Sequence, residues 1–367
     1  MRTLNVDLGE RSYPIYIGGG LLDKAGEYFE QHGLTKKSPV LIVTDTNVAP
    51  LYLIKVEGAL SDSGYTVVSK IVKSGEKSKS LQVFEEVMTT AIEGGLDRRS
   101  VVVALGGGVV GDLAGYVAAA YMRGVTFVQM PTTILAHDSS VGGKVAVNHP
   151  LAKNMIGAFH QPEMVLYDVD TLQSLPDREV RAGLSEMIKH GLIWDAAFAK
   201  WCGEHTQDLL NLDPEALGYG LTMGCSVKAK VVSTDETEQG LRAILNLGHT
   251  IGHALEAIGG YGEFLHGEAI SIGMAAAALI AVNRGRDREL YNETVKLLQG
   301  FGLPTVMPNH LDENKIISAM MHDKKFKENQ IVFILPVSIG KVEIVSDVKL
   351  EEVVSVIREL KKEGQHV

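Results

Sequence analysis

Short apolar runs alternate with longer amphipathic stretches along the first half of the chain. The runs are rich in β-branched residues, so we expect strands at Val40–Asp45, Thr66–Val72, Val101–Leu105, Val125–Met130 and Val165–Val169. Helical spacing lies between them, at Ala49–Ser63, Ser80–Glu93 and Val109–Tyr121. The opening segment, Arg2–Gly20, has the pattern of a hairpin. This alternation predicts βαβ units and therefore a parallel sheet with helices on its faces.

The periodicity becomes mainly helical near Asp170–Pro176. We expect helices at Arg178–Ile193, Pro214–Thr234, Leu247–Ile258, Glu268–Asn283 and Arg288–Gly300. A late segment, Ile331–Val345, predicts two short strands with a turn at Ser338–Gly340, and Leu350–Lys362 predicts an amphipathic helix. The sequence therefore predicts an α/β domain over residues 1–172 and a mostly α-helical domain over residues 173–367.

Composition narrows the class of protein. The chain has 367 residues and a net charge of −10, which disfavours non-specific binding of nucleic acid. Its two cysteines form no CxxC pair, so a disulfide framework or a cysteine zinc site is not expected. Met1–Glu10 lacks the apolar run of a signal peptide, and the apolar stretch Ile270–Val282 is too short to span a bilayer. We therefore expect a cytoplasmic protein that binds neither nucleic acid nor membrane.

A glycine-rich turn, Gly106–Asp112, follows an apolar strand and opens a helix, and it fits GxGxxG. Such a turn binds phosphate through free N–H groups at the helix start, but a tight strand-to-helix turn has the same pattern. It does not follow the first strand, and no acidic residue ends a strand about 20 residues later. Asp45 ends an earlier strand, where it either binds ribose hydroxyls or simply begins a helix. Polar residues also end strands at Ser74–Lys79 and Thr132–Thr133.

Two histidines one helical turn apart, His249 and His253, suit a metal site. The segment is not HExxH, because Thr250 stands in place of the glutamate, so a metalloprotease is disfavoured. Spacing alone favours His249 and His253 as the ligand pair and leaves the third ligand open. A pair of hydrogen-bonded core histidines is the alternative interpretation. Basic residues within apolar segments either are solvated or converge on an anionic substrate: Lys144, Lys153, Lys189, Lys228 and Arg242.

Taken jointly, the motifs resemble those of the 3-dehydroquinate synthase family. The matching segments are LGGGVVGDLAGY, PTTILAHDSSVGGKVAVNHP, AKNMIGAFHQP, GLSEMIKHG, GLRAILNLGHTIGHALE and HGEA. The resemblance runs from Asp45 to Asp323–Lys325 and implies a Rossmann-like N-terminal domain and a helical, metal-binding C-terminal domain. It also implies NAD and Zn²⁺ or Co²⁺ as cofactors, a homodimer, and a phosphorylated sugar acid, 3-deoxy-D-arabino-heptulosonate 7-phosphate, as the substrate.

Residue-by-residue matching then assigns roles. It implies Glu186, His249 and His266 as metal ligands, so His266 replaces the His253 that spacing favours. The implied NAD contacts are Asp45, Asn47, Glu76, Lys79, Gly107, Gly108, Asp112, Thr132, Thr133, Lys153 and Thr171. The implied catalytic residues are Lys144, Lys189, Asp138, His253 and Asn246. The implied substrate-binding residues are Arg123, Asn154, Lys228, Arg242 and a lysine of Asp323–Lys325, for which we favour Lys324.

Two details qualify the resemblance. Arg123 matches an arginine that reaches the phosphate across the dimer interface, and the spacing from Thr133 to Asp138 is one residue shorter than in some members. Three rival functions remain open at this point. They are a cyclase that makes 2-deoxy-scyllo-inosose from glucose 6-phosphate, a metal-dependent polyol dehydrogenase, and an inactive NAD- or metal-binding regulator.

Overall fold

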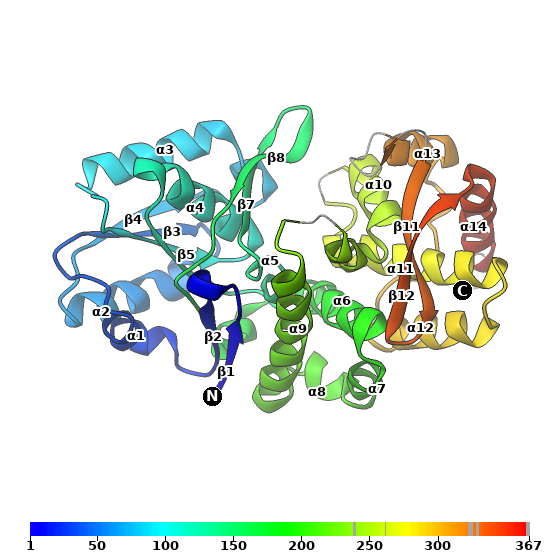
Figure 1. The fold of residues 1–367 in the computed structure, drawn as a ribbon, viewed down its shortest axis with the longest axis horizontal. Helices are drawn as coiled ribbons and strands as arrows, with labels where there is room; N and C mark the ends of the chain where they lie inside the picture. The colour runs from blue at the N-terminus through cyan, green and yellow to red at the C-terminus, as the bar shows by residue number, and fades with distance from the viewer. Residues whose placement is uncertain (238–239, 261, 322–325, 328–329, 365–367) are drawn as a thin grey trace. The chain divides into compact units, whose positions relative to one another are not determined.

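The computed structural model describes residues 1–237, 240–260, 262–321, 326–327 and 330–364, and Figure 1 shows their fold. The chain forms two compact units. Unit 1 comprises Met1–Leu175 and Leu217–Thr237, and unit 2 comprises Pro176–Ala216 and Glu238–Val367. The prediction put the boundary at residue 172, whereas unit 1 continues to Leu175. It also put Leu217–Thr237, most of one helix, in the second domain.

That helix, α9 (Pro214–Thr234), shows why the period of a helix does not decide its domain. Its side chains bond to unit 1. The Tyr219 ring lies under the Arg2 guanidinium, 5.6 Å from ring centroid to Cζ. Lys228 Nζ donates to Asp138 Oδ2 at 2.9 Å. The apolar spacing of α9 is the same whichever domain covers it, so only these contacts reveal the assignment.

Unit 1 is built on a seven-stranded sheet of order β1-β2-β9-β6-β5-β3-β4. The strands are β1 (Arg2–Val6), β2 (Tyr13–Gly18), β3 (Val40–Asp45), β4 (Val67–Val72), β5 (Val101–Gly106), β6 (Thr126–Pro131) and β9 (Met164–Asp168). Within this sheet, all of whose strands the structure describes, only the β1–β2 pair is antiparallel. Each of the five strands predicted after the hairpin is present within one residue at either end, which confirms the α/β class.

Alternate residues of the central strands serve two hydrophobic cores. Val40 and Ile42 of β3 point into one core, and Leu41 and Val43 point into the other. Helices α1 (Ala25–Gln31) and α2 (Ile54–Asp62) cover the first face, while α3 (Leu81–Glu93) and α4 (Gly108–Ala120) cover the second (Figure 1). Burial on both faces explains why these strands are continuous apolar runs.

The strand order reverses between β3 and β5. The chain goes from β3 to β4 on one side, and β5 pairs with β3 on the other. In open parallel sheets, ligands bind beyond the carboxyl ends of the strands at such a switch point. The fold therefore directs attention to the residues that follow β3, β4, β5 and β6.

A hairpin of β7 (Lys144–His149) and β8 (Ala152–Phe159) was not predicted. It extends beyond the main sheet (Figure 1). Its inward face packs on the α4 side through Val145 and Val147. Most of β8 is exposed, so the strand lacks the apolar alternation by which a half-buried strand is detected.

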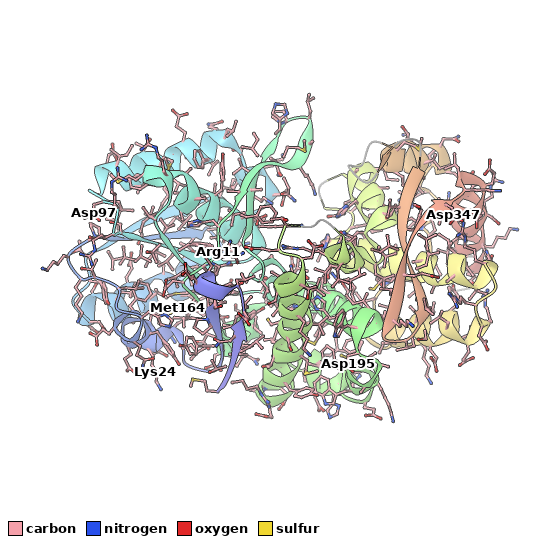
Figure 2. All side chains as sticks on the ribbon, in the orientation of Figure 1. Arg11, Lys24, Asp97, Met164, Asp195 and Asp347 are labelled. Atoms are coloured by element: carbon pink, nitrogen blue, oxygen red, sulfur yellow. The ribbon has the colours of Figure 1, made fainter. Side chains whose placement is uncertain are left out.

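Unit 2 is mainly helical. Its helices are α6 (Asp177–Trp194), α7 (Ala196–Glu204), α8 (Thr206–Leu210), α10 (His249–Gly259), α11 (His266–Asn283), α12 (Arg288–Gly300), α13 (Glu313–Met321) and α14 (Leu350–Glu363). A small antiparallel sheet joins β10 (Phe326–Lys327), β11 (Gln330–Ser338) and β12 (Lys341–Val348). The helices predicted from periodicity are present, whereas α7, α8 and α13 were not predicted. Asp195, labelled in Figure 2, separates α6 from α7 because its side chain accepts from Phe198 N at 3.0 Å and caps α7.

Helix α11 lies at the centre of unit 2. By length and composition it would suffice to cross a membrane, but 78 % of it is buried, as in the core helix of a globular domain. Gly267 in its first turn lies against α6, where an added Cβ would stand 1.9 Å from the carbonyl oxygen of Ala182. Glycine thus lets the start of α11, with His266, approach the helix that carries Glu186.

Candidate active site

Three potential metal ligands meet in unit 2 from three different helices. Glu186 comes from the middle of α6, His249 from the first residue of α10, and His266 from the first residue of α11. His249 Nε2 is 3.5 Å from Glu186 Oε1, and His266 Nε2 is 3.3 Å from the same oxygen. The Glu186 side chain is fully buried, while those of His249 and His266 are 11 % and 28 % exposed. Two imidazoles and a carboxylate make a catalytic zinc-type donor set.

The second ring nitrogen of each imidazole, Nδ1, also has a hydrogen-bond partner. His249 Nδ1 donates to the carbonyl oxygen of Leu247 at 3.1 Å. His266 Nδ1 lies 3.3 Å from Glu256 Oε2. Such outer bonds fix the ring orientation and the tautomer of metal-ligating histidines. With both Nδ1 atoms engaged, both Nε2 atoms are directed at one carboxylate oxygen, which is the arrangement that a shared cation requires.

The charges around this group act in opposite directions. Lys189, one turn along α6, forms a buried ion pair with Glu186. Burial, followed by the Lys189 charge, lowers the pKa of His249 well below its usual value. Burial also lowers the pKa of His266, but hydrogen bonds to Glu186 and Glu256 outweigh it and raise that pKa to about 10. The two carboxylates thus attract positive charge to His266, whereas the Lys189 ammonium opposes it at His249.

Spacing alone had favoured His249 with His253. The structure instead groups Glu186, His249 and His266, whose ligand atoms lie within 4.8 Å of one another. His253 shares a separate group with Glu256 and His266. Sequence reasoning missed Glu256, although a signal existed. His249, His253 and Glu256 are spaced i, i+4 and i+7, which places all three on one face of α10.

In unit 1, the residues implied for NAD follow the carboxyl ends of neighbouring strands. Asp45 ends β3, Glu76 follows β4, Gly107 follows β5, Thr132 follows β6 and Thr171 follows β9. Because these strands are parallel and adjacent, the five residues lie along one edge of the sheet. The edge includes the β3–β5 switch point, where such folds bind ligands.

The glycine turn after β5 is shaped by a close approach. An added Cβ at Gly107 would stand 2.9 Å from Thr133 Cγ2, so only glycine fits beside the Thr132–Thr133 turn. Among the described residues, no side chain caps the N-terminus of α4. Free N–H groups at a helix start bind phosphate well. The turn is tight, as one interpretation held, and it also has the features of a phosphate site.

Asp45 has a structural role in this conformation. Its Oδ1 accepts from Asn47 N at 2.8 Å and from Val48 N at 3.1 Å. The carboxylate therefore holds the turn that leads into the next helical segment, as the simpler of the two interpretations expected. These bonds engage Oδ1, and a role for Asp45 at a ribose stays a prediction.

Lys79 joins residues implied for NAD to one implied for the substrate. Its Nζ donates to Asp112 Oδ2 at 2.5 Å and to Asn154 Oδ1 at 2.6 Å. Lys79 is buried, with 5 % of its side chain exposed. Burial raises the pKa of Asp112 above its usual value, although the Lys79 cation opposes the shift. The Asp112 side chain is 22 % exposed, so the ion pair is partly buried, with Lys79 as its more deeply buried partner.

A second, partly buried pair in unit 1 joins Lys228 to Asp138. Lys228 Nζ bonds both the side chain and the backbone carbonyl of Asp138. Asp138 lies on the one-turn helix α5 (Ala136–Ser139), beyond the Thr132–Thr133 turn. Tyr167 on β9 donates its hydroxyl to the carbonyl oxygens of Thr133 and Ile134. This support by Tyr167 was not predicted from the sequence.

The remaining predicted residues are placed as follows. Lys144 begins β7 and Lys153 lies on β8, both exposed. Arg242 and Asn246 lie on the 3-10 helix η7 (Leu241–Asn246) of unit 2, where Arg242 is buried. Arg123 ends the 3-10 helix η5 (Tyr121–Arg123) of unit 1, next to Met122, and both have positive φ. Lys324 lies outside the described residues.

Two family models match consecutive parts of the chain. The model for the 3-dehydroquinate synthase N-terminal domain matches residues 69–182, and that for the C-terminal domain matches residues 183–326. A 3-dehydroquinate synthase of Desulforamulus reducens is 52 % identical over 359 residues, which cover 97 % of this chain and 99 % of the relative. The chain belongs to the 3-dehydroquinate synthase family. This membership confirms the resemblance on which the site residues were chosen.

Solved structures outside 3-dehydroquinate synthase itself share the fold at lower identity. A 2-deoxy-scyllo-inosose synthase complexed with carbaglucose-6-phosphate, NAD⁺ and Co²⁺ has a TM-score of 0.90 and is 27 % identical, covering 98 % of this chain and 100 % of its own. A 2-epi-5-epi-valiolone synthase from Streptomyces hygroscopicus with NAD⁺ and Zn²⁺ bound has a TM-score of 0.88 and is also 27 % identical, covering 97 % and 99 %. Sugar cyclases thus share this architecture with the 3-dehydroquinate synthases.

Proposed function

We propose that this chain is a cytoplasmic 3-dehydroquinate synthase. It converts 3-deoxy-D-arabino-heptulosonate 7-phosphate into 3-dehydroquinate and phosphate, so its bond-breaking step is that of a carbon–oxygen lyase. The observation that carries the proposal is 52 % identity over nearly the whole chain to a relative of that name. The convergence of His249 and His266 on one oxygen of Glu186 supports it, because it supplies the donor set that the reaction needs.

The cofactors we propose are NAD and a Zn²⁺ or Co²⁺ ion. When bound, NAD supplies reversible hydride acceptance and the divalent metal acidifies hydroxyl groups that it coordinates. The metal fits Glu186, His249 and His266 because their outer bonds leave both Nε2 atoms facing the carboxylate. NAD fits the strand-end edge of unit 1, where Gly107 leaves room beside Thr133 and α4 offers its first N–H groups.

The chain's own residues then bind and position the substrate. By resemblance to the family, phosphate-binding roles are proposed for Lys144, Asn154, Asn246 and His253. Lys228 and Arg242 are proposed to hold the carboxylate, and the bonds to Asp138 fix where the Lys228 ammonium stands. The phosphate of the substrate accepts the proton during its own elimination, so no strong protein base is required. Much of the rate acceleration then comes from holding one conformer through several steps.

The closest rival reaction is the cyclisation of glucose 6-phosphate. That substrate has no carboxylate, so the carboxylate-binding role proposed for Lys228 and Arg242 would serve no group of it. The 2-deoxy-scyllo-inosose synthase structure is only 27 % identical to this chain, against 52 % for the 3-dehydroquinate synthase relative. Incubation with glucose 6-phosphate, NAD⁺ and zinc should release no phosphate, and turnover of that sugar would favour the rival.

We also propose a homodimer formed through the outward face of β8. The strand and the turn before it expose three large apolar side chains spaced four residues apart, Leu151, Met155 and Phe159, which are 88 %, 53 % and 48 % exposed. His160, directly after β8, bonds the carbonyl oxygen of Val125 through its Nε2 atom at 2.9 Å. Val125 is two residues from Arg123, so the exposed strip ends near that arginine. An exposed apolar strip of this kind is typical of an association surface.

Light scattering should therefore give about twice the chain mass of 39.7 kDa. The substitution Phe159→Glu places a charge on the strip and should shift the protein towards the monomer. Ile54→Glu is the matched control, because Ile54 is an 81 % exposed apolar residue of unit 1 on α2. A monomeric mass for the unmodified protein, or a dimer that Phe159→Glu leaves intact, would contradict this interface.

A further inference from the structure

Asn148 joins two segments that carry proposed binding residues. It lies near the end of β7, and its backbone N donates to the carbonyl oxygen of Lys79 at 2.8 Å. Its side-chain Nδ2 donates to Glu76 Oε1 at 2.7 Å. Its Oδ1 accepts from the backbone N of Asn154 at 2.8 Å. One side chain thus connects the segment after β4 with strand β8.

The chemistry of these partners admits an amide and not a carboxylate. An ionised Glu76 can only accept a hydrogen bond, and the backbone N–H of Asn154 can only donate one. An asparagine side chain carries a donor group, Nδ2, and an acceptor, Oδ1. The two partners therefore fix its orientation, with Nδ2 towards Glu76 and Oδ1 towards Asn154. An aspartate at position 148 would still accept from Asn154, but it would place a second negative charge against Glu76.

The bond to Asn154 also holds a backbone conformation that L-residues seldom adopt. Asn154 has φ +55°, in the left-handed region, within a strand. Its side-chain Oδ1 accepts from Lys79 Nζ at 2.6 Å. The position of the Asn154 amide relative to Lys79 therefore depends on the backbone geometry that Asn148 secures.

We propose that Asn148 is a positioning residue that couples the NAD-binding segment, Glu76–Lys79, to the substrate-binding residue Asn154. The inference rests on the proposed function, which assigns those roles to Glu76, Lys79 and Asn154. It assigns to Asn148 no contact with NAD or substrate. Its effect is transmitted through the orientation of the Glu76 carboxylate and the Asn154 backbone.

The test is calorimetric NAD⁺ binding to the full-length, zinc-loaded protein, together with the KM for NAD⁺ and kcat. The substitution Asn148→Asp should weaken NAD⁺ binding by about tenfold, the size expected for losing a hydrogen bond to a charged group. The KM for NAD⁺ should rise by a similar factor, more than kcat falls. Asn148→Ala removes both side-chain bonds without adding charge, so it should weaken binding less and serves if Asn148→Asp does not fold.

A rescue distinguishes positioning from general damage. In a Glu76→Gln background, the amide introduced at position 76 can donate to an aspartate at position 148, which restores a bond with the donor and acceptor exchanged. The penalty of Asn148→Asp on NAD⁺ affinity should therefore be several-fold smaller in that background than in the presence of Glu76. A non-specific disturbance of the hairpin would give the same penalty in both backgrounds.

Asn292→Asp is the matched control. Asn292 Nδ2 also donates to a glutamate, Glu289 Oε2 at 3.2 Å, but on the exposed surface of α12. It should leave NAD⁺ affinity and KM unchanged. Equal NAD⁺ affinity of folded Asn148→Asp or Asn148→Ala and the unmodified protein would overturn the inference, as would the absence of rescue. If the unmodified, zinc-loaded protein bound no NAD⁺, the proposed function would fail first, and the role of Asn148 with it.

Discussion

Glu186→Gln should lower kcat by more than about 100-fold, which is the upper end of the effect of replacing an outer partner of a metal ligand. Replacing Glu186 should lower kcat more than replacing such an outer partner would, because Glu186 is itself a proposed ligand. Its Oε1 is the atom on which His249 Nε2 and His266 Nε2 converge. A neutral amide removes the negative charge that attracts a cation to this point. Metal analysis of the purified protein should show zinc content falling from about one per chain towards zero.

Glu179→Gln provides the control for this substitution, because Glu179 lies on the same helix, α6, but is exposed. It should retain both zinc and activity. If Glu186→Gln kept its zinc and turned over normally, the ligand assignment would be wrong. The grouping of His253 with Glu256 and His266 would then be the next candidate site.

Lys79→Met should weaken both stability and NAD⁺ binding. The ammonium is buried and bonds Asp112 and Asn154, so its removal leaves the Asp112 carboxylate without its closest cation. Breaking a fully buried pair costs about 3–5 kcal/mol in the free energy of unfolding, and because Asp112 is 22 % exposed we expect a loss of up to about 3 kcal/mol. We also expect NAD⁺ affinity to fall by about 10- to 100-fold, because Lys79 is a proposed NAD contact and a hydrogen bond to a charged group contributes about 1.5–3 kcal/mol. Urea denaturation and calorimetric NAD⁺ binding measure the two effects.

The loss of stability in Lys79→Met should also depend on pH. Burial already raises the pKa of Asp112, and removing the opposing Lys79 cation raises it further. A carboxyl whose pKa is higher in the folded state binds more protons there, so stability falls as the pH rises from the unfolded towards the folded pKa. The variant should therefore lose less stability, relative to the unmodified protein, at acid pH than at neutral pH.

Two further variants test whether this loss comes from the unpaired Asp112 carboxylate. Adding Asp112→Asn to Lys79→Met removes the stranded charge and should recover part of the stability. Lys55→Met is the matched control, because Lys55 pairs with Asp23 at 3.3 Å with both side chains about half exposed. It should change stability by less than about 1 kcal/mol. Equal losses in Lys79→Met and Lys55→Met would show that the partial burial of the Lys79 pair does not raise the cost of breaking it.

The sequence predicted the helices and strands of this fold better than it predicted which of them pack against one another. Buried strands such as β3 and β5 are continuous β-branched runs, and amphipathic helices such as α12 have a clear period, so both were found. The β7–β8 hairpin was missed because most of β8 is exposed. Periodicity describes one helix at a time, so it did not show that α9 packs mainly with unit 1.

The same limit applies to the site. Spacing along α10 placed His249 and His253 on one face but could not show which other helix approaches it. Only the packing of α6 and α11 brings Glu186 and His266 to His249, and the resemblance to a family supplied that set before the structure did. Asn148 contacts Glu76, which is distant in sequence, and Glu256 contacts His266, which lies on another helix. Only the three-dimensional structure shows these partners.

Phosphate release from 3-deoxy-D-arabino-heptulosonate 7-phosphate, with catalytic NAD⁺ and zinc, is the most direct measurement of the central claim. We predict release that a chelator abolishes and that zinc or cobalt restores, with 3-dehydroquinate formed in equal amount and no net NADH. Accumulation of NADH in proportion to substrate would instead indicate a dehydrogenase. Absence of phosphate release from protein loaded with zinc and NAD⁺ would contradict the account.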